Sequence, residues 1–423
     1  MKTEGLLDHG SGSKAKTRRA VVLDRAPGRG LAQPALGIVA LAVGLVVISN
    51  PSWAQTADDL AKQYKRETMQ QALQTKDHYD LYGLHFASDK ATIEADAKSL
   101  LDDIAKTLKN FPDWHLRIVG HTDATGDPEP NEALSLARAN AIKTALIEHG
   151  IDAQRLAAAG AGEMRPVAPN NTPEGRALNR RVELIRFTDS EAAKQLLKAM
   201  SDYLAKQQAI SFDYDAALEV VTNDKHKLEL ASSGTVTLDR PDKIRASRAG
   251  GFVDTETVFD GKTLTLLGKN ANKYTEVEFA GTVDQVIDEL KDKHDRPLPA
   301  ADLLLSDSYS ALMEDVYDSK DLGSGVIHGT ECDFLAFRKD DVDLQVWIAQ
   351  GEQPRPCKYV ITSRLVPDAP QYTIEFTNWK TGDQAVKDDF VFNNTTKAEK
   401  IDIKDLQEKA SELPSNFARG DQK

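Results

Sequence analysis

The dominant spacing of apolar residues changes near Ser211, and this change limits the folds that are open to the chain. Before Ser211, strand-like segments alternate with segments of helical spacing; after it, apolar and polar residues mostly alternate one by one. About 370 residues follow position 54, more than one hydrophobic core usually holds. The sequence therefore predicts two domains, over residues 79–188 and 190–405, with a helical lead-in over 55–78 and a polar tail over 406–423.

The first predicted domain alternates strands with helices. Strands are expected near Tyr79–Phe86, at 115–120, near Leu156–Gly160 and at Arg181–Phe187. Helices are expected at 131–149 and around an apolar face made of Ile93, Ala97, Leu101, Ile104 and Leu108. These elements predict an α/β sandwich with helices on one face of a small mixed sheet. Gly160-Ala161-Gly162 lacks the third glycine and the following helix of a dinucleotide-binding loop, so we interpret it as a turn.

The second predicted domain opens with an amphipathic helix over Ala192–Gln207. The expected strands are Leu228–Leu238, Lys243–Ser247, Thr255–Phe259, Leu264–Leu267, Thr275–Phe279, Leu344–Ile348, Tyr359–Thr362 and Tyr372–Phe376. Asp260-Gly261 predicts a hairpin turn, and helices at Val283–Asp292 and Tyr309–Val316 interrupt the strands. This pattern predicts a curved antiparallel half-barrel covered by helices, which makes the whole chain α+β.

The first 54 residues are expected to be a signal peptide. A basic stretch precedes an apolar run from Ala35 to Ile48, and small residues around Trp53 fit a cleavage site before Gln55. The run is shorter than the roughly 18 residues of a stable membrane span, although an uncleaved N-terminal anchor remains an alternative. No cysteine follows the run, so a lipid-anchored N-terminus is not expected.

The charge of the chain bears on its partners. The formal net charge is -13, and the basic leader leaves the remainder more acidic still. Such acidity argues against nucleic acid and against docking on anionic lipid, because both reward Lys and Arg.

Cys332 and Cys357 are the two cysteines of the chain. Both are expected in an oxidising compartment, where thiols pair when their geometry allows it. Each lies beside a strand-like run, which favours a disulfide across neighbouring strands. Free thiols remain an alternative, whereas a metal site is disfavoured because His328 alone would be an incomplete set of further ligands.

Residues 120–138 place an acid and a base around a turn. An apolar strand ends at Gly120, so Asp123 is expected in the loop just past it. Asn131 is a plausible N-cap for the helix that follows, and Arg138 lies about two turns inside that helix. A carboxylate and a planar double donor held close together suit a ligand with an ammonium and a carboxylate on one carbon. Asp123 could also be a simple turn acid, and Arg138 a solvated helix residue.

Several motifs in order resemble the peptidoglycan-binding domain of OmpA and of the peptidoglycan-associated lipoproteins: Leu81–Ala91, Gly120–Asp123, Asn131, Leu134–Ala139 and Gly175–Glu183. The resemblance implies that Asp123 and Arg138 hold the amine and the carboxylate of diaminopimelate in the peptidoglycan stem peptide. It also makes Asn131, Asn179 and Arg180 candidates for backbone or carboxylate contacts. We favour Arg180 over Arg181. The implied location is the periplasm of a Gram-negative bacterium, at the cell wall or the outer membrane.

The second half resembles a family of predicted periplasmic proteins without an assigned activity. The matching segments are Arg240–Arg245, Phe259–Gly261, Leu298–Leu304, His328–Cys332, Leu335–Arg338 and Gln345–Ile348. That family looks like the lipoprotein-carrier fold, the open half-barrel of LolA and LolB that the sensor RseB also uses. Such a half-barrel holds either a packed core or an apolar cavity for an acyl chain, in which Trp347 and Trp379 could take part; the packed core is favoured.

The sequence therefore predicts a non-enzymatic protein that binds peptidoglycan through its first domain. The second domain is expected to bind an apolar ligand, a lipoprotein or an envelope protein, and the alternative is an RseB-like sensor that acts on an envelope signalling protein. No cofactor or metal site is expected, and a search for a nucleophile elbow, a zinc helix motif, a phosphate loop and a redox cysteine pair finds none.

Overall fold

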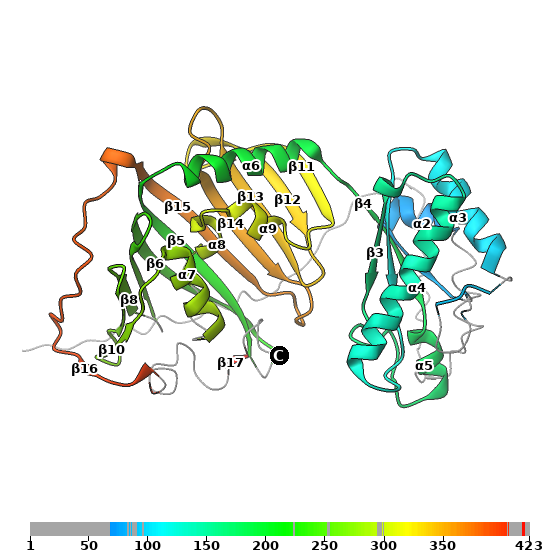
Figure 1. Ribbon diagram of the computed structural model, residues 1–423, viewed down its shortest axis with the longest axis horizontal. Helices are drawn as coiled ribbons and strands as arrows, with labels where there is room; N and C mark the ends of the chain where they lie inside the picture. Colours follow the sequence, from blue (N-terminus) through cyan, green and yellow to red (C-terminus); the bar gives the residue numbers. More distant parts are fainter. Residues whose placement is uncertain are drawn as a thin grey trace, which may run out of the picture. The chain divides into compact units, whose positions relative to one another are not determined.

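The computed structural model (Figure 1) describes residues 68–82, 84, 86, 91–94, 97–222, 225–251, 254–293, 298, 300–403, 405 and 417–418. The predicted signal peptide 1–54 with its cleavage site before Gln55, the first part of the lead-in 55–78 and most of the tail 406–423 lie outside the described residues. From the lead-in and the tail, the structure describes a helix, α2 (Met69–Lys76), and a short strand, β17 (Phe417–Ala418). None of the helices in the described part is long and apolar enough to cross a membrane.

In the described part of the chain, four strands form the first sheet, in the order β1-β4-β2-β3. They are β1 (His78–Leu81), β2 (His115–Gly120), β3 (Leu156–Gly160) and β4 (Val182–Phe187). β2 and β3 run parallel, whereas β4 is antiparallel to β1 and to β2. This is the small mixed sheet that the sequence predicts, although β1 ends at Leu81 and not at Phe86.

Two long helices, α3 (Lys98–Asn110) and α4 (Pro128–Glu148), pack against this sheet. Their inward side chains are at most 1% exposed and meet equally buried residues of β2 and β4; the set is Ile104, Leu108, Ile142, Leu146, Leu116, Ile118 and Leu184. Two predicted boundaries are wrong. Ile93 lies outside α3 and forms an isolated bridge with Phe86. α4 begins at Pro128, whose ring is preorganised for a first helical turn, so Asn131 lies inside the helix and is not its N-cap.

Two glycines let α4 lie directly on the sheet. A Cβ added at Gly120 would stand 2.1 Å from the carbonyl oxygen of Ser135, and one at Gly160 would stand 2.7 Å from that of Glu132. Gly120 of β2 and Gly160 of β3 are directly paired in the sheet. The two strands therefore present two neighbouring positions without side chains to α4. The close contact fixes the first turns of α4 relative to the loop that follows β2.

Among the residues that the structure describes, thirteen strands form the second sheet, along the path β11-β12-β13-β14-β15-β5-β6-β7-β8-β9-β10-β16, with β17 paired to β5 beside it. The bounds are β5 (Ala209–Thr222), β6 (Lys227–Asp239), β7 (Lys243–Gly250), β8 (Asp254–Phe259), β9 (Thr263–Gly268), β10 (Lys273–Glu278), β11 (Asp318–Ile327), β12 (Thr330–Arg338), β13 (Val342–Ala349), β14 (Pro356–Ser363), β15 (Gln371–Thr381) and β16 (Glu399–Lys400). Neighbours along this path are antiparallel, except for the parallel pair of β10 and β16. The path does not close on itself, which confirms the predicted open, curved antiparallel sheet.

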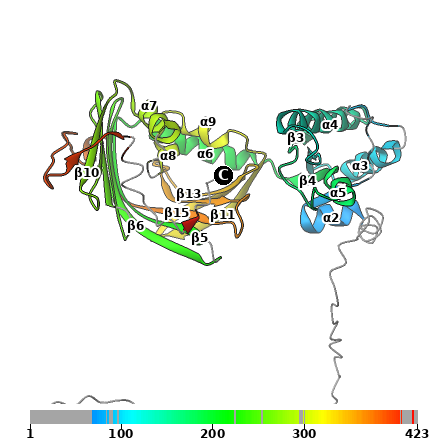
Figure 2. The ribbon, with the colours of Figure 1, turned by 90° about the horizontal axis from the view of Figure 1, so that it is seen from below.

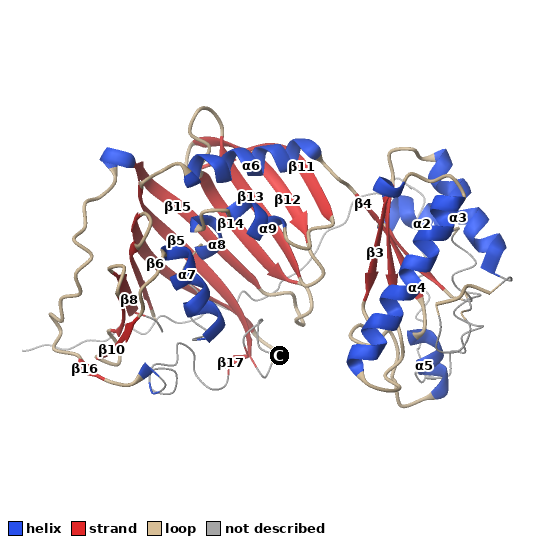
Figure 3. Cartoon of the chain, viewed as in Figure 1, coloured by secondary structure: helices blue, strands red, loops and turns tan. Residues whose placement is uncertain are grey.

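Helices lie within the curve of this sheet, as Figure 2 shows, and Figure 3 separates them from the strands by colour. They are α6 (Glu191–Ala205), α7 (Val283–Asp288) with its π-helical continuation η3 (Glu289–Lys293), α8 (Ala301–Leu304) and α9 (Ser308–Met313). Leu197, Met200 and Leu204 of α6 are at most 1% exposed and share one core with Leu335 and Ile348 of the sheet. The helices therefore fill the concave face with packed side chains, and the predicted α+β class is confirmed.

The two tryptophans named in the sequence analysis lie in different places. Trp379 packs against the concave core, with its ring centroid 4.5 Å from that of Phe212. Trp347 lies between two inward-facing residues of β13, Val346 and Ile348, so it stands on the outer face and lines no concave cavity. There it stacks on Phe334, with ring centroids 4.2 Å apart.

Cys332 and Cys357 lie in a small buried cluster beside Trp347. The structure records both as free thiols, and they interact with each other. They belong to β12 and β14, and β13 lies between these strands, so the expectation of neighbouring strands is wrong. Burial raises the pKa of both thiols, which makes them poor nucleophiles. The disulfide itself stays a prediction.

Candidate functional site

The candidate site lies where β2 ends and α4 begins. The first residues of the connecting loop are tied to the chain on either side of β2. The N–H of His121 donates to the carbonyl of Arg181 (3.0 Å), and the N–H of Thr122 donates to that of Gly162 (2.8 Å). Asp123 follows directly and is therefore held at a defined point past the end of the strand.

The carboxylate of Asp123 is bonded at both oxygens. Oδ1 accepts the N–H of Thr125 (2.9 Å), and Oδ2 accepts from Nη1 of Arg180 (2.6 Å). Burial by itself would raise the pKa of Asp123, but the hydrogen bonds from Thr125 and Arg180 outweigh it and hold that pKa below its usual value. Asp123 is therefore ionised at neutral pH, as an acid that binds a cation must be.

Asn131 ties the helix to this loop. Its Nδ2 donates to the carbonyls of Asp123 (3.4 Å) and Thr125 (3.2 Å) and to Oε2 of Glu163 (2.8 Å). Asn131 is 8% exposed, and its hydrogen bonds fix the backbone of Asp123 and Thr125. Glu163 follows β3 in a segment without apolar periodicity, so no local sequence pattern marks it as a site residue.

Asn179, at the end of the short helix α5 (Pro173–Asn179), supports the site from a second loop. Its Oδ1 accepts the N–H groups of Val167 and Ala168, and its Nδ2 donates to Oδ1 of Asn170 (2.8 Å). The same oxygen of Asn170 accepts the N–H of Ala124 (3.1 Å). Asn179 thus supports the backbone of Ala124, the residue after Asp123, through Asn170. No local sequence pattern marks Asn170 as a site residue.

Two further arginines, Arg138 and Arg181, lie on α4 and directly before β4. Arg138 lies two turns after Asn131 on α4, with its guanidinium carbon 5.1 Å from the centroid of the Phe86 ring. Arg181 is 7% exposed and donates to Asp80 (3.0 Å), away from Asp123. The structure therefore joins Asp123 directly to Asn131 and Arg180 and indirectly to Asn179. The pairing of Arg138 with a ligand carboxylate stays a prediction.

A second polar cluster lies beneath the loop, on the sheet. Glu183 of β4 lies between His78 (Oε1 to Nε2, 2.9 Å) and His121 (Oε2 to Nε2, 3.0 Å). Burial would raise the pKa of Glu183, but the hydrogen bonds to the two histidines lower it strongly. The hydrogen bond to Glu183 raises the pKa of His78, whereas burial lowers that of His121. No group of three or more His, Cys, Asp or Glu side chains among the described residues could hold a metal ion.

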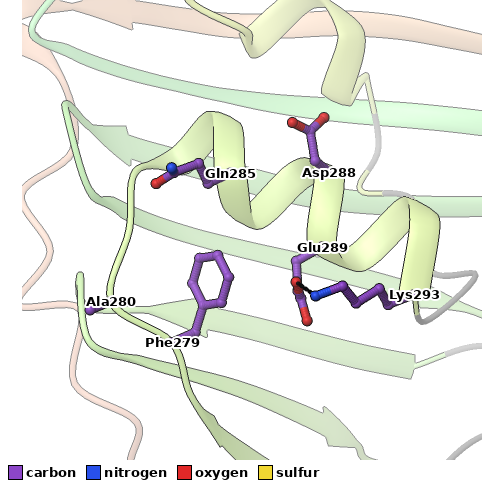
Figure 4. A pocket seen from close by; sticks show the side chains of 6 residues that line it. All are labelled: Phe279, Ala280, Gln285, Asp288, Glu289 and Lys293. Atoms are coloured by element: carbon purple, nitrogen blue, oxygen red, sulfur yellow. Dashed lines mark ion pairs between the residues drawn. The ribbon is translucent and has the colours of Figure 1, made fainter.

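The second domain contains a pocket of about 310 Å³ next to α7, η3 and the end of β10 (Figure 4). It is lined by Phe279, Ala280, Gln285, Asp288, Glu289 and Lys293. Nζ of Lys293 lies 2.8 Å from Oε2 of Glu289, so these two charges satisfy each other. A lining with this many polar groups differs from the mostly apolar walls that an acyl chain requires.

Two segments of the chain match known families. Residues 193–404, half of the chain, match the family described as "Predicted periplasmic protein (DUF2092)". The chain belongs to this family. Residues 85–180 match the OmpA family, so the DUF2092 domain follows an OmpA-like domain, as the motifs predict. The two families confirm the predicted periplasmic, envelope-associated location. The likeness of the DUF2092 domain to LolA, LolB and RseB stays a hypothesis.

Individual relatives match about a quarter of the chain. Outer membrane protein Omp38 of Acinetobacter baumannii is 46% identical over 98 residues, which cover 23% of this chain and 28% of that protein. Peptidoglycan-binding protein ArfA of Mycobacterium bovis is 39% identical over 100 residues, or 24% and 31%. The crystal structure of the peptidoglycan-associated lipoprotein from Burkholderia pseudomallei is 33% identical, with a TM-score of 0.24, over 25% of this chain and 88% of that one. The chain spans less than a third of the length of the two curated relatives.

Proposed function

We propose that this DUF2092 protein is a non-enzymatic cell-wall-binding protein of the periplasm. Its OmpA-like domain binds the diaminopimelate of the peptidoglycan stem peptide, with Asp123 on the ammonium and Arg138 on the carboxylate. Arg180 is the second cation of the site. Asn131 and Asn179 hold the loops that form the site. The observation that carries this proposal is the carboxylate of Asp123, which is ionised and fixed at the end of β2 beside an exposed guanidinium.

The composition of the site supports binding and not hydrolysis. A glycoside hydrolase needs a carboxyl group that is protonated at the working pH, so that it can donate a proton to the leaving group. The pKa of Asp123 is shifted in the opposite direction. The comparisons support this assignment. ArfA is named as a peptidoglycan-binding protein, and residues 85–180 of this chain match the OmpA family.

For the DUF2092 domain, we propose a polypeptide partner, a lipoprotein or another envelope protein. The concave face is filled by buried side chains of α6 to α9, which leaves this space to the protein's own core. An apolar small ligand and an RseB-like sensor role are the alternatives. In both alternatives the OmpA-like domain would hold the DUF2092 domain near the cell wall.

The wall-binding proposal is tested by cosedimentation with purified sacculi that contain diaminopimelate. We expect Asp123→Asn and Arg138→Gln each to weaken binding about tenfold or more, because each removes charge-assisted hydrogen bonds of about 1.5 to 3 kcal/mol. Asp123→Asn keeps an acceptor for the N–H of Thr125, so the loop should remain folded.

Asp77→Asn is the matched control, because Asp77 pairs with Arg186 elsewhere in the same domain. It should leave sedimentation unchanged, and melting curves should show that all variants fold. Full binding by the Asp123→Asn, Arg138→Gln double variant would refute the assignment of the site.

A further inference from the structure

The acid of the proposed site is already paired within the chain. Oδ2 of Asp123 accepts from Nη1 of Arg180 at 2.6 Å, while Oδ1 is taken by the N–H of Thr125. An incoming ammonium must therefore compete with Arg180 for Oδ2. The bond to Thr125 need not break, since it involves the other oxygen.

The two partners of this ion pair differ in how firmly they are held. The side chain of Asp123 is 11% exposed, whereas that of Arg180 is 51% exposed. The backbone of Arg180 is anchored, because its N–H donates to the carbonyl of Arg176 at the end of α5. The carboxylate is thus the fixed member of the pair, and the long arginine side chain is the member that can turn towards solvent without moving the backbone.

We propose that Arg180 makes the site selective for a zwitterion by exchange of partners. The ligand's ammonium takes Oδ2 of Asp123, and the guanidinium of Arg180 that is released joins Arg138 at the carboxylate on the same carbon. The proposal rests on the proposed function, because it concerns the same Asp123, and it adds which ligands are rejected.

The selectivity follows from counting ion pairs. Apart from the pair that Arg138 forms with the ligand's carboxylate, a zwitterion exchanges one internal pair for two pairs with the ligand, Asp123 with its ammonium and Arg180 with its carboxylate. A ligand with an ammonium alone exchanges one pair for one and leaves Arg180 without its carboxylate. Arg138 also favours a ligand with a carboxylate, but Arg180 is the residue that occupies Oδ2 of Asp123 in this structure, so the exchange of partners depends on Arg180.

The test measures the binding of three soluble muropeptides to the full chain by calorimetry. The first ends in meso-diaminopimelate; the second carries the same residue with an amide in place of the carboxylate next to its free amine; the third carries lysine. The proposal expects the unmodified protein to prefer the first over the other two by about tenfold or more.

Arg180→Ala should bind the amidated and lysine peptides more tightly, because Arg180 no longer occupies Oδ2 of Asp123. It should bind the diaminopimelate peptide less tightly, because the ligand's carboxylate loses a partner. The ratio of the dissociation constants should fall by about tenfold. Arg180→Lys should restore part of the ratio, since it keeps the charge. Arg186→Ala, which removes an arginine paired with Asp77 in the same domain, should leave the ratio unchanged.

The outcomes separate the two proposals. If the protein binds diaminopimelate but Arg180→Ala keeps the same ratio, the role of Arg180 is refuted and wall binding stands. If the unmodified protein binds none of the three peptides, the proposed function is refuted, and the role of Arg180 with it. A fall in the ratio for Arg180→Ala, with an unchanged melting temperature, supports both.

Discussion

Two carboxylates of the OmpA-like domain, the buried Asp123 and the partly buried Glu183, are neutralised by different kinds of partner. Asp123 is paired with an arginine, a residue type that stays charged in proteins, so a change of pH within the physiological range should not break this pair. Glu183 depends on His78 and His121, whose charges change in the physiological range. The site itself should therefore be insensitive to pH, while the cluster under the loop should not be.

The cluster gives a prediction for stability against pH. The folded-state pKa of His78 is raised above its ordinary value of 6.5, so its contribution to stability is complete below that value and is lost as the pH rises through the folded pKa. His78→Gln should therefore destabilise the protein at about pH 5.5 and have little effect at about pH 9, measured by urea unfolding.

The control is the same substitution in a Glu183→Gln background, where His78 has lost its main partner and His78→Gln should change little at either pH. Glu183 acts in the opposite direction: its pKa is lowered, so its contribution is present above its ordinary value of 4.5 and is lost as the pH falls further. An equal loss of stability for His78→Gln at both pH values would contradict the assignment of the ion pair.

The residues of the site differ in how far the sequence could predict them. Asp123 and Arg138 follow from local patterns, a strand end and a helix, together with the order of the motifs. Glu163 and Asn170 lie in the segment between β3 and α5, which has no apolar periodicity, and they reach the site only because β2 pairs with both β3 and β4. Their contacts are properties of the tertiary structure.

At the scale of elements, the position of α4 decides whether the site forms. The helix carries Asn131 and Arg138, and it approaches the sheet over Gly120 and Gly160. A side chain at either glycine would push the first turns of α4 away from the loop of Asp123.

We therefore expect Gly120→Ala to lower the free energy of unfolding by about 1 to 3 kcal/mol, because the new methyl group meets backbone that cannot turn away. Denaturant unfolding measures this, and sacculus binding should weaken as well. Gly251→Ala is the control, since an added Cβ there meets no atom within 4 Å. Equal stability of the two variants would mean that α4 can shift without cost.

Most elements are predictable from their apolar spacing, and the exceptions have physical reasons. The expected strands of the second domain lie within or close to β6 to β10 and β13 to β15. β11 is missed because it is an edge strand with exposed residues and two glycines, Gly323 and Gly325, that break the alternation. α5 is missed because seven residues are too few for an apolar stripe, and Pro173 and Thr172 are its main signals.

For the whole molecule, strand order is the feature that the sequence predicts least. The central pairing joins β5 to β15, whose paired residues Leu218 and Tyr372 are far apart in the chain. This pairing brings the first and last long strands of the DUF2092 domain together, so that hairpins extend on both sides and the sheet curves around α6 to α9. No local pattern encodes it, because the contact depends on the burial of all these elements at once.

The filled concave face leads to a prediction for the intact protein. Leu197, Met200 and Leu204 of α6 pack where a carrier would hold an acyl chain, and burial of these side chains should stabilise the domain by several kcal/mol in total. A lipid would have to displace these side chains, and burial of its own methylenes would contribute only about 0.8 kcal/mol each.

We therefore expect native mass spectrometry of the gently purified protein to give the polypeptide mass alone, and solvent extraction to yield no stoichiometric lipid. A known lipid carrier, purified in parallel, is the control for loss during handling. One acyl lipid per chain would contradict a polypeptide partner for this domain and would require α6 to leave the sheet.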